Sequence, residues 1–288
     1  MSETLLTLRA LGREAQYRNL KIRTPDGLVL AAQDWGQPTS GRDVLLIHGY
    51  SQSHLSWLKQ VSGPLAREFR LVSYDTRGHG GSDKPLDPHF YREPSRWADE
   101  VAAVIRETGL QRPVLVVWSY AGRIALDYVS CRGDAAISAL VFVNATSKAD
   151  STVLGPAAPI LRRMTQHDLA TNIEATVELL QACTAQPLPA EELRYMLAFN
   201  MVVPAAIRAK LAGRAADYEA TLRALQVPVL ALHGGQDPVN LPAMADYTCA
   251  MAPNARKIVY SGVAHMPFWE VPEAFDRDLG EFVRNIGA

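Results

Sequence analysis

The stretch Val116–Arg123, with the sequence VVWSYAGR, places a serine between an apolar run and a helix-like segment. The preceding run is rich in β-branched residues and the following residues, Ile124–Tyr128, are helix-like, which predicts a strand, a sharp turn and a helix with Ser119 at the corner. A common sequence for such a corner is G-x-S-x-G, because the residues two before and two after the serine must be small. Here those positions hold Val117 and Ala121. The stretch therefore indicates either a nucleophile corner or a hydrogen-bonded turn serine.

The composition is that of an enzyme-sized globular protein. The chain has 288 residues, of which 48% are hydrophobic and 20% charged, and this length suffices for one large α/β domain with or without an inserted lid. The net charge is -1 and no block of like charges occurs, so the electrostatic footprint of a nucleic-acid-binding protein is absent. The three cysteines are far apart and odd in number, which favours neither a disulfide framework nor a zinc site.

The N-terminal stretch MSETLLTLRALGREAQ has an acidic residue near its start and no long apolar core, so we do not expect a secretory signal. No stretch approaches the ~18 apolar residues of a membrane helix. We therefore expect a cytoplasmic protein that has neither a nucleic acid nor a membrane as partner. The sequence carries no signal for an oligomeric state.

Short apolar runs alternate with segments of helical length along most of the chain. Continuous β-rich runs are typical of strands in a parallel sheet that is covered on both faces. The expected strands are an early antiparallel one, Leu28–Trp35, followed by Val44–Ile47, Leu71–Tyr74, Val114–Trp118, Ala139–Val143, Val229–Leu232 and Ile258–Tyr260. The expected helices are Trp57–Phe69, Pro94–Thr108, Tyr120–Cys131, Pro242–Met251 and Glu273–Asn285. This order predicts an α/β protein with a doubly wound, mostly parallel sheet.

The segment from residue 146 to 225 interrupts the alternation, because no convincing strand occurs in it. Its apolar residues recur at helical spacing, with helices expected at Ala170–Cys183 and Ala190–Phe199. We interpret it as a helical cap inserted into a core formed by residues 1–145 and 226–288; the alternative is that it simply extends the core. Bulky side chains in the cap and beside the predicted site are candidate substrate contacts, namely Trp118, Met164, Tyr195, Phe199, Met201 and Met266.

Two loops after early strands are rich in glycine and histidine. In the loop after Val44–Ile47, Gly49 lets the chain bend tightly, so the backbone amides of Tyr50 and Tyr120 are candidate donors to an oxyanion. The glycines of YDTRGHGGSDKP, residues 74–85, lack the G-x-G-x-x-G pattern that binds dinucleotides. The loops also hold two histidines that we expect to fix loop structure, His48 and His79.

Asp237 and His265 each follow a late strand. Asp237 lies in the turn after Val229–Leu232, where a carboxylate can orient an imidazole; the alternative is a helix N-cap. His265 lies in the loop after the last predicted strand, although a histidine between apolar neighbours is by itself more often structural. The order Ser119, Asp237, His265, each after a different strand of one parallel sheet, is typical of a Ser–Asp–His triad.

The chain resembles the α/β-hydrolase family in these residues and the motifs around them. The matching pieces are His48-Gly49, YDTRGHGGSD, WSYAGRIALDY, HGGQDPV and GVAHMPFWEVPEAF. They span most of the chain outside the cap and the first forty residues. The resemblance implies Ser119 as nucleophile, His265 as base and Asp237 as acid, with the amides of Tyr50 and Tyr120 holding the oxyanion.

The nearest resemblance is to bacterial carboxylesterases, lactonases, C–C bond hydrolases and cofactor-free haloperoxidase-like perhydrolases. Relatives that use an aspartate nucleophile, the epoxide hydrolases and dehalogenases, are disfavoured by Ser119. The departure from the family is Val117, which stands where glycine is usual.

We therefore predict a serine hydrolase that cleaves an ester or lactone through an acyl-enzyme, with no metal and no organic cofactor. The apolar cap favours a bulky small-molecule substrate, and similarity in layout to macrolide esterases makes a macrocyclic lactone one candidate. Two alternatives stay open. One is a perhydrolase in which hydrogen peroxide attacks the acyl-enzyme, and the other is a non-catalytic ligand receptor on a hydrolase scaffold.

Overall fold

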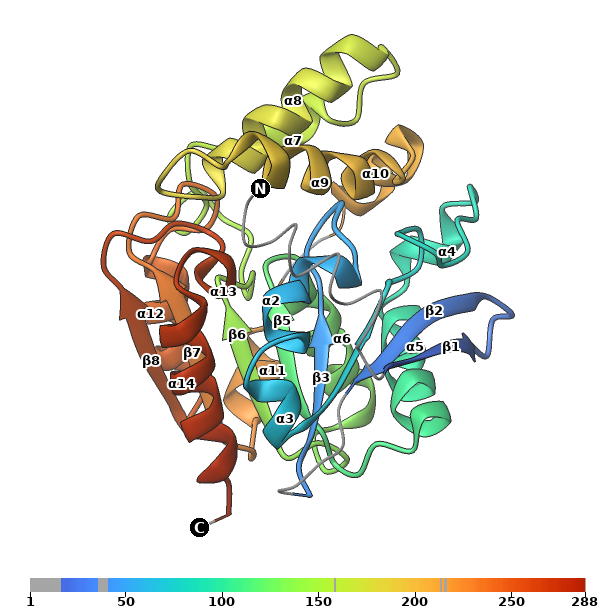
Figure 1. Ribbon diagram of the computed structural model, residues 1–288. Coiled ribbons are helices and arrows are strands. Elements are labelled where there is room, and N and C mark those ends of the chain that lie inside the picture. Colours follow the sequence, from blue (N-terminus) through green and yellow to red (C-terminus); the bar gives the residue numbers. More distant parts are fainter. Residues whose placement is uncertain (1–16, 36–40, 158, 213, 215–216, 288) are drawn as a thin grey trace.

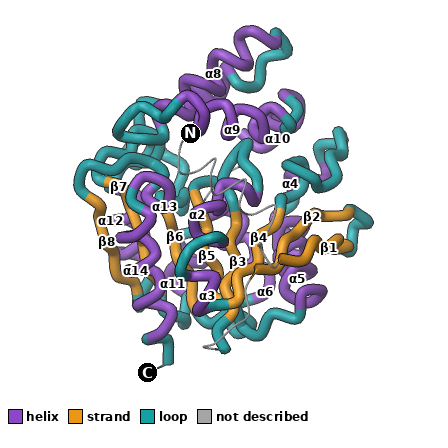
Figure 2. The backbone as a smooth tube through the Cα atoms, in the orientation of Figure 1, coloured by secondary structure: helices purple, strands orange, loops and turns teal. Residues whose placement is uncertain are grey.

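The computed structural model describes residues 17–35, 41–157, 159–212, 214 and 217–287. They form one eight-stranded sheet in the order β1-β2-β4-β3-β5-β6-β7-β8, with helices on both faces (Figures 1 and 2). The strands are β1 (Tyr17–Arg23), β2 (Val29–Trp35), β3 (Asp43–Ile47), β4 (Arg70–Tyr74), β5 (Val114–Trp118), β6 (Ala139–Val143), β7 (Val229–Gly234) and β8 (Ala255–Tyr260). The strands β3 to β8 pair with one another in parallel, whereas β2 pairs antiparallel with β1 and β4, which confirms the predicted mostly parallel α/β sheet. The N-terminal stretch for which no secretory signal is expected lies outside the described residues.

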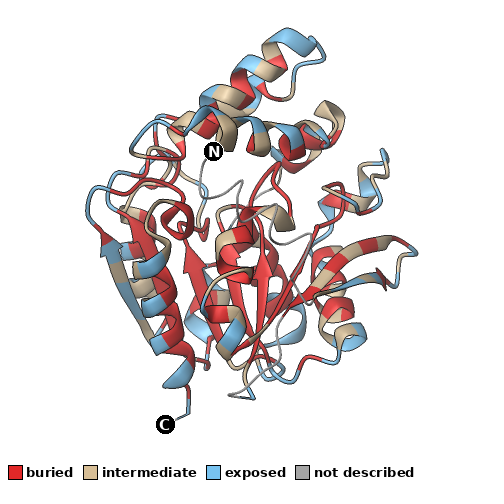
Figure 3. Ribbon diagram, in the orientation of Figure 1, coloured by how far each residue is buried: buried red, intermediate tan, exposed pale blue. Residues whose placement is uncertain are grey.

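The central strands are buried along their whole length, as their continuous apolar runs predict. All residues of β3, β5, β6 and β7 are buried (Figure 3). Because both faces of these strands are covered by helices, no polar–apolar alternation is needed in their sequences.

The strand β1 is absent from the sequence prediction. Its residues YRNLKIR are mostly charged or polar, and four of the seven are exposed. It lies at the edge of the sheet and pairs antiparallel with β2, where the ring of Tyr17 stacks on that of Trp35 at 4.3 Å. The pairing partner, rather than local hydrophobicity, decides that this stretch is a strand.

The helices form one layer on each face of the sheet, and α7 to α10 form a further group at one end of it. In one layer α5 packs on α6, α6 on α11 and α11 on α12; in the other, α2 packs on α13 and α14. None of the helices in the described ranges is long and apolar enough to cross a bilayer. Their bounds are α4 (His89–Arg92), α5 (Pro94–Thr108), α6 (Ala121–Arg132), α7 (Ile160–Arg163), α8 (Leu169–Ala182), α9 (Ala190–Met201), α10 (Ala205–Ala212), α11 (Glu219–Ala224), α12 (Ala243–Met251), α13 (Pro267–Glu270) and α14 (Pro272–Arg284).

The single helix predicted over Trp57–Phe69 is wrong. The structure has the 3-10 turn η1 (His54–Trp57) and two short helices, α2 (Leu58–Val61) and α3 (Leu65–Glu68). The break falls at Gly63-Pro64, because proline has no N–H to continue the helix and disfavours helical backbone in the residue before it.

The segment between β6 and β7 is helical. Figure 1 shows α7, α8, α9 and α10 together at one end of the sheet, beyond β5 and β6. The fifth helix of the segment, α11, packs beside the sheet on α6 and α12. The division into a core of residues 1–145 and 226–288 and a cap of residues 146–225 stays a prediction.

Candidate active site

Ser119 sits at a strained corner between β5 and α6. Its φ is +53°, a left-handed conformation that costs a non-glycine residue about 1–3 kcal/mol. The corner is held because the Ser119 amide donates to Val143 O at 3.1 Å and the Ser119 carbonyl accepts from the amide of Thr146 at 2.9 Å. Such a bend projects the serine side chain away from the sheet, which is the geometry expected of a nucleophile corner.

Two glycines let neighbouring chain segments approach this corner. A Cβ on Gly122 would lie 2.6 Å from Thr146 O, and one on Gly49 would lie 3.0 Å from the Cβ of Ser119. Val117, in contrast, is fully buried within the sheet, where it pairs with Ile47 and Phe142. The close approach of α6 therefore occurs at Gly122, one residue later than the common pattern places it.

Asp237 and His265 are brought together from the loops after β7 and β8. The Oδ2 atom of Asp237 lies 2.7 Å from Nδ1 of His265, and both side chains are buried. Oδ1 of Asp237 accepts the amides of Val239 and Asn240 at 2.8 and 3.1 Å. Although burial acts to raise the pKa of Asp237, the charge and hydrogen bond of His265, the charge of His233 and a hydrogen bond from Asn144 hold that pKa below its usual value. The carboxylate stays ionised and fixes the imidazole with Nδ1 protonated.

Asn144 is a further member of this group that sequence reasoning missed. It is fully buried at the end of β6, with φ +45°, and its Nδ2 donates to Asp237 Oδ2 at 2.6 Å. The signal that could have found it is a polar residue directly after the buried run ALVFV, at the same sheet edge as Ser119 and Asp237.

The backbone of His265 is held from two sides. Its amide donates to Cys183 O at 3.0 Å, at the end of α8, and its carbonyl accepts Nε1 of Trp118 at 2.9 Å. The Glu270 carboxylate adds a second link, because it accepts the amides of Ala264 at 2.8 Å and Ala185 at 2.7 Å. The segment between β6 and β7 is thus hydrogen-bonded directly to the loop that carries His265.

Two buried histidines hold the loop after β3. His48 Nε2 accepts the Thr76 amide at 3.0 Å, so Nδ1 carries the proton and donates to Gly49 O at 2.8 Å. His79 Nε2 accepts the amide of Ser51 at 3.2 Å. Burial lowers the pKa of His48 to about 4 and that of His79 to about 3, so both rings are neutral. The predicted loop-fixing role of these histidines matches their contacts.

The amide of Tyr50 follows Gly49, the residue of this loop that lies against the Ser119 corner. Within the described part of the chain, neither this amide nor that of Tyr120 donates a hydrogen bond to another group. Tyr120 stands at the N-terminus of α6, where backbone amides are directed away from the helix.

A small cavity of about 30 Å³ lies beside Ser119, His265 and Tyr50. Ser119, His265, Trp118 and Tyr50 line it from the sheet side, and its apolar wall includes three residues from the segment between β6 and β7, namely Leu161, Leu179 and Cys183. The other predicted substrate contacts do not line this cavity: Met164, Tyr195, Phe199, Met201 and Met266. Met164 and Met266 are fully buried, and the ring of Tyr195 packs against Phe199 and Trp269.

Residues 44–272 match the model of the alpha/beta hydrolase fold family, which is more than half of the chain. The chain belongs to the α/β-hydrolase family. The parallel sheet, the strained serine corner and the Asp–His pair described above agree with this membership.

Several relatives are similar to the chain over nearly its full length. The bifunctional esterase/perhydrolase of Acinetobacter calcoaceticus is 27% identical, with 92% of this chain and 99% of the relative covered. A non-heme chloroperoxidase of Kitasatospora aureofaciens is 25% identical, with 90% and 98% covered. Among solved structures, an esterase from Rhodococcus sp. ECU1013 is similar with a TM-score of 0.87 and 28% identity, covering 93% of this chain and 99% of that one.

Proposed function

We propose that the protein is a serine hydrolase that cleaves carboxylic esters or lactones through an acyl-enzyme on Ser119. The observation that carries the proposal is that a serine with a strained backbone and an Asp237-bound histidine line one cavity. The relatives that are esterases or perhydrolases support the same class of reaction.

In the proposed mechanism, Nε2 of His265 takes the proton of Ser119 as Oγ attacks the substrate carbonyl. The negative oxygen of the tetrahedral intermediate is held by the amides of Tyr50 and Tyr120, which donate to no other group in the described residues. The C–O bond then breaks and the leaving alcohol receives the proton from His265. Water, deprotonated by His265, attacks the acyl-enzyme and releases the acid and free Ser119.

The nucleophile, base and oxyanion donors all come from the chain, so we propose a reaction without a metal or organic cofactor. Dialysis against a chelator should leave activity unchanged. A location in the cytoplasm stays an expectation from the sequence, and no nucleic acid takes part in the proposed reaction.

The volume of the cavity at Ser119 limits the size of the substrate that fits without movement of the protein. Sites that enclose drug-sized ligands measure roughly 300–1,000 Å³, whereas the cavity at Ser119 measures about 30 Å³. A bulky ester or macrocyclic lactone would therefore require α7 and α8 to move away from Ser119. Esters with a short acyl or alcohol part need less displacement, and we propose them as the preferred substrates of this arrangement.

A hydrolysis screen tests the proposal. Purified protein would be given activated esters of increasing acyl length and a set of macrocyclic lactones, with release of acid as the readout. Turnover that is blocked by a serine-directed phosphonate is expected. Tight ligand binding without any turnover would instead support a receptor on a hydrolase scaffold.

Perhydrolysis is a second candidate, and the named activity of the Acinetobacter relative, an esterase/perhydrolase, favours it. In this reaction hydrogen peroxide replaces water and the acyl-enzyme yields a peracid. Comparing product formation from one ester at equal nucleophile concentrations would rank the two reactions.

Val117→Gly should leave turnover within about tenfold, because no proton or charge is handled at this strand position. The free energy of unfolding should fall by about 1–3 kcal/mol through lost burial and a more flexible chain. Assaying both proteins on one activated ester and measuring denaturant unfolding checks this. A hundredfold gain in activity would mean that valine distorts the corner in the native protein.

Leu179→Ala should change chain-length selectivity, because Leu179 lines the cavity at Ser119. We expect the ratio of kcat/KM for longer over shorter acyl esters to rise by about tenfold, the lower end of the effect of one methylene in an apolar pocket. The matched control is Leu180→Ala, in the same helix. Leu180 is fully buried but does not line the cavity, so this variant should lose stability and keep the ratio. Equal ratios in both variants would contradict the assignment of the cavity to substrate.

A further inference from the structure

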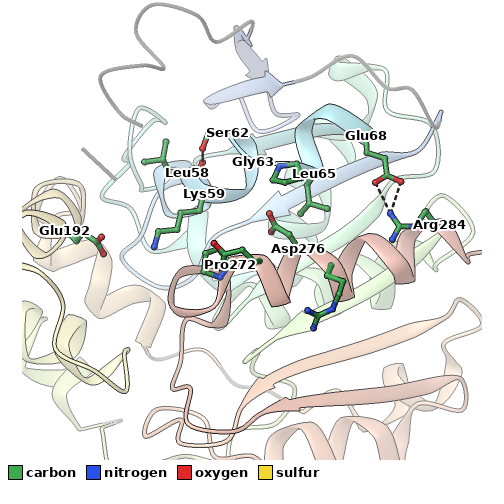
Figure 4. A pocket seen from close by; sticks show the side chains of 13 residues that line it. Leu58, Lys59, Ser62, Gly63, Leu65, Glu68, Glu192, Pro272, Asp276 and Arg284 are labelled. Atoms are coloured by element: carbon green, nitrogen blue, oxygen red, sulfur yellow. Dashed lines mark hydrogen bonds and ion pairs between the residues drawn. The ribbon is translucent and has the colours of Figure 1, made fainter. Parts of the chain in front are cut away.

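A second and larger pocket lies between the α2–α3 segment and α14 (Figure 4). Its volume is about 490 Å³, which falls in the range of roughly 300–1,000 Å³ that is typical of small-molecule sites. None of the residues that line it lines the cavity at Ser119. Its apolar walls come from Leu58, Pro64, Leu65 and Pro272.

The carboxyl group of Asp276 lies in this pocket and is only partly satisfied. Asp276 is 8% exposed, and Figure 4 shows its side chain between α14 and the segment that carries Gly63 and Leu65. Oδ1 accepts Nε2 of Gln60 at 3.1 Å, while Nε2 donates its other hydrogen to Phe268 O at 2.8 Å. Within the described part of the chain, no group donates to Oδ2 of Asp276, and the buried Oε1 of Gln60 has no donor either.

The basic side chains that line the pocket bond to groups other than Asp276. Lys59 Nζ donates to Trp269 O at 2.8 Å, and Figure 4 shows it directed away from Asp276. Arg284 binds Glu68 at 2.9 Å, and Arg277 binds Asp278 at 3.0 Å.

The remaining acidic residues at the pocket increase its negative character. Glu273 lies one turn before Asp276 on α14, and Glu192 of α9 accepts Nε1 of Trp269 at 2.6 Å. Burial, together with the charge of Glu273, raises the pKa of Asp276 to about 7, against the hydrogen bond from Gln60. A buried carboxyl without a cation is costly, and a cationic ligand would remove that cost.

We propose that this pocket binds a small organic cation, a protonated primary amine with a short apolar body, through Asp276. An ammonium group carries three donors and matches the open carboxyl oxygen, while the apolar part would lie against the leucines and prolines. An anion would face the carboxyl groups of Asp276, Glu273 and Glu192, and a neutral ligand would leave Asp276 without compensation. A metal site does not fit, because the described residues contain no group of three or more His, Cys, Asp or Glu side chains that could hold one.

Binding should depend on pH in a defined direction. The ammonium favours the ionised form of Asp276, so ligand binding must displace the proton that the free protein holds below pH 7. We expect the affinity to rise about tenfold between pH 6 and pH 8, because the ionised fraction rises from about one tenth to about nine tenths while an alkylamine stays protonated.

The test is a calorimetric titration of the full chain with butylammonium, and with butanol as the neutral probe of the same shape. The Ser119→Ala variant is titrated alongside, so that binding is measured independently of the proposed ester hydrolysis. Butylammonium is expected to bind, and butanol is expected to bind at least tenfold more weakly. No heat at about 10 mM butylammonium, where a millimolar site would be saturated, or equal binding of butanol, would overturn the proposal.

Two substitutions on α14 locate the site. Asp276→Asn keeps an oxygen for Gln60 and should weaken butylammonium at least tenfold and abolish the pH dependence. Glu281→Gln is the matched control, because this carboxylate is exposed on the same helix and does not line the pocket; it should leave the affinity within twofold. If Asp276→Asn does not fold, Glu273→Gln is expected to weaken binding severalfold. If the folded variant, whether Asp276→Asn or Glu273→Gln, binds butylammonium with unchanged affinity, the proposal is overturned.

Discussion

Ser119→Ala should lower kcat/KM for ester hydrolysis by about 10⁴-fold or more, with no loss of folded structure. Alanine keeps the Cβ that the corner already accommodates at φ +53°, so the strain and packing of the corner are unchanged. What is lost is the oxygen that would form the acyl-enzyme. Steady-state kinetics on an activated ester, together with the melting temperature, measures both parts of this expectation.

The control for this variant is Ser62→Ala. The hydroxyl of Ser62 donates to Leu58 O at 2.7 Å, outside the cavity at Ser119, so activity should stay within twofold. Labelling by a serine-directed phosphonate should disappear in Ser119→Ala and persist in Ser62→Ala. A folded Ser119→Ala protein with near-normal turnover would end the serine-hydrolase proposal.

Asp237→Asn should reduce kcat by about 10⁴-fold, the scale of the same change in serine proteases. In the native protein the carboxylate oxygen of Asp237 accepts the proton on Nδ1 of His265 at 2.7 Å. An asparagine that donates its amide at this place would stabilise the tautomer with the proton on Nε2, and His265 could then no longer accept the Ser119 proton.

Asp150→Asn is the matched control for the acid. Asp150 also follows a strand of the parallel sheet, β6, but its side chain is 34% exposed and pairs with Lys148, while Oδ1 accepts the Thr152 amide at 2.8 Å. This variant should therefore keep near-normal kcat. If Asp237→Asn kept near-normal kcat while Asp150→Asn lost most of its kcat, the acid would be assigned to the wrong strand end.

The strands and the order of the chemical groups were predictable from local sequence. Runs such as Val114–Trp118 are apolar throughout because both faces of the sheet are covered, and this requirement acts on each residue separately. Polar groups at the ends of such runs, including Ser119 and Asp237, must meet at one edge, because parallel strands all end there. The pattern alone thus predicts that these residues lie close together.

Features that depend on a partner could not be predicted in the same way. The strand β1 is polar and exists because β2 supplies its hydrogen bonds and Trp35 a surface for Tyr17. The roles of Asn144 and Glu270 arise from contacts over 93 residues with Asp237 and over 85 residues with Ala185. No periodicity within a short window carries such pairings.

The cavity at Ser119 shows the same division between sequence and tertiary structure. Helical spacing correctly predicted helices between β6 and β7, yet it could not say which of their apolar faces would point toward Ser119. The structure turns Leu161 and Leu179 to the cavity and buries Met164 elsewhere. The sequence by itself determined the parallel strands, most of the long helices and the chain order of serine, aspartate and histidine, because these follow from burial and strand direction. Only the tertiary structure decided which side chains surround Ser119, because the rotation of each helix about its axis is set by packing against distant residues.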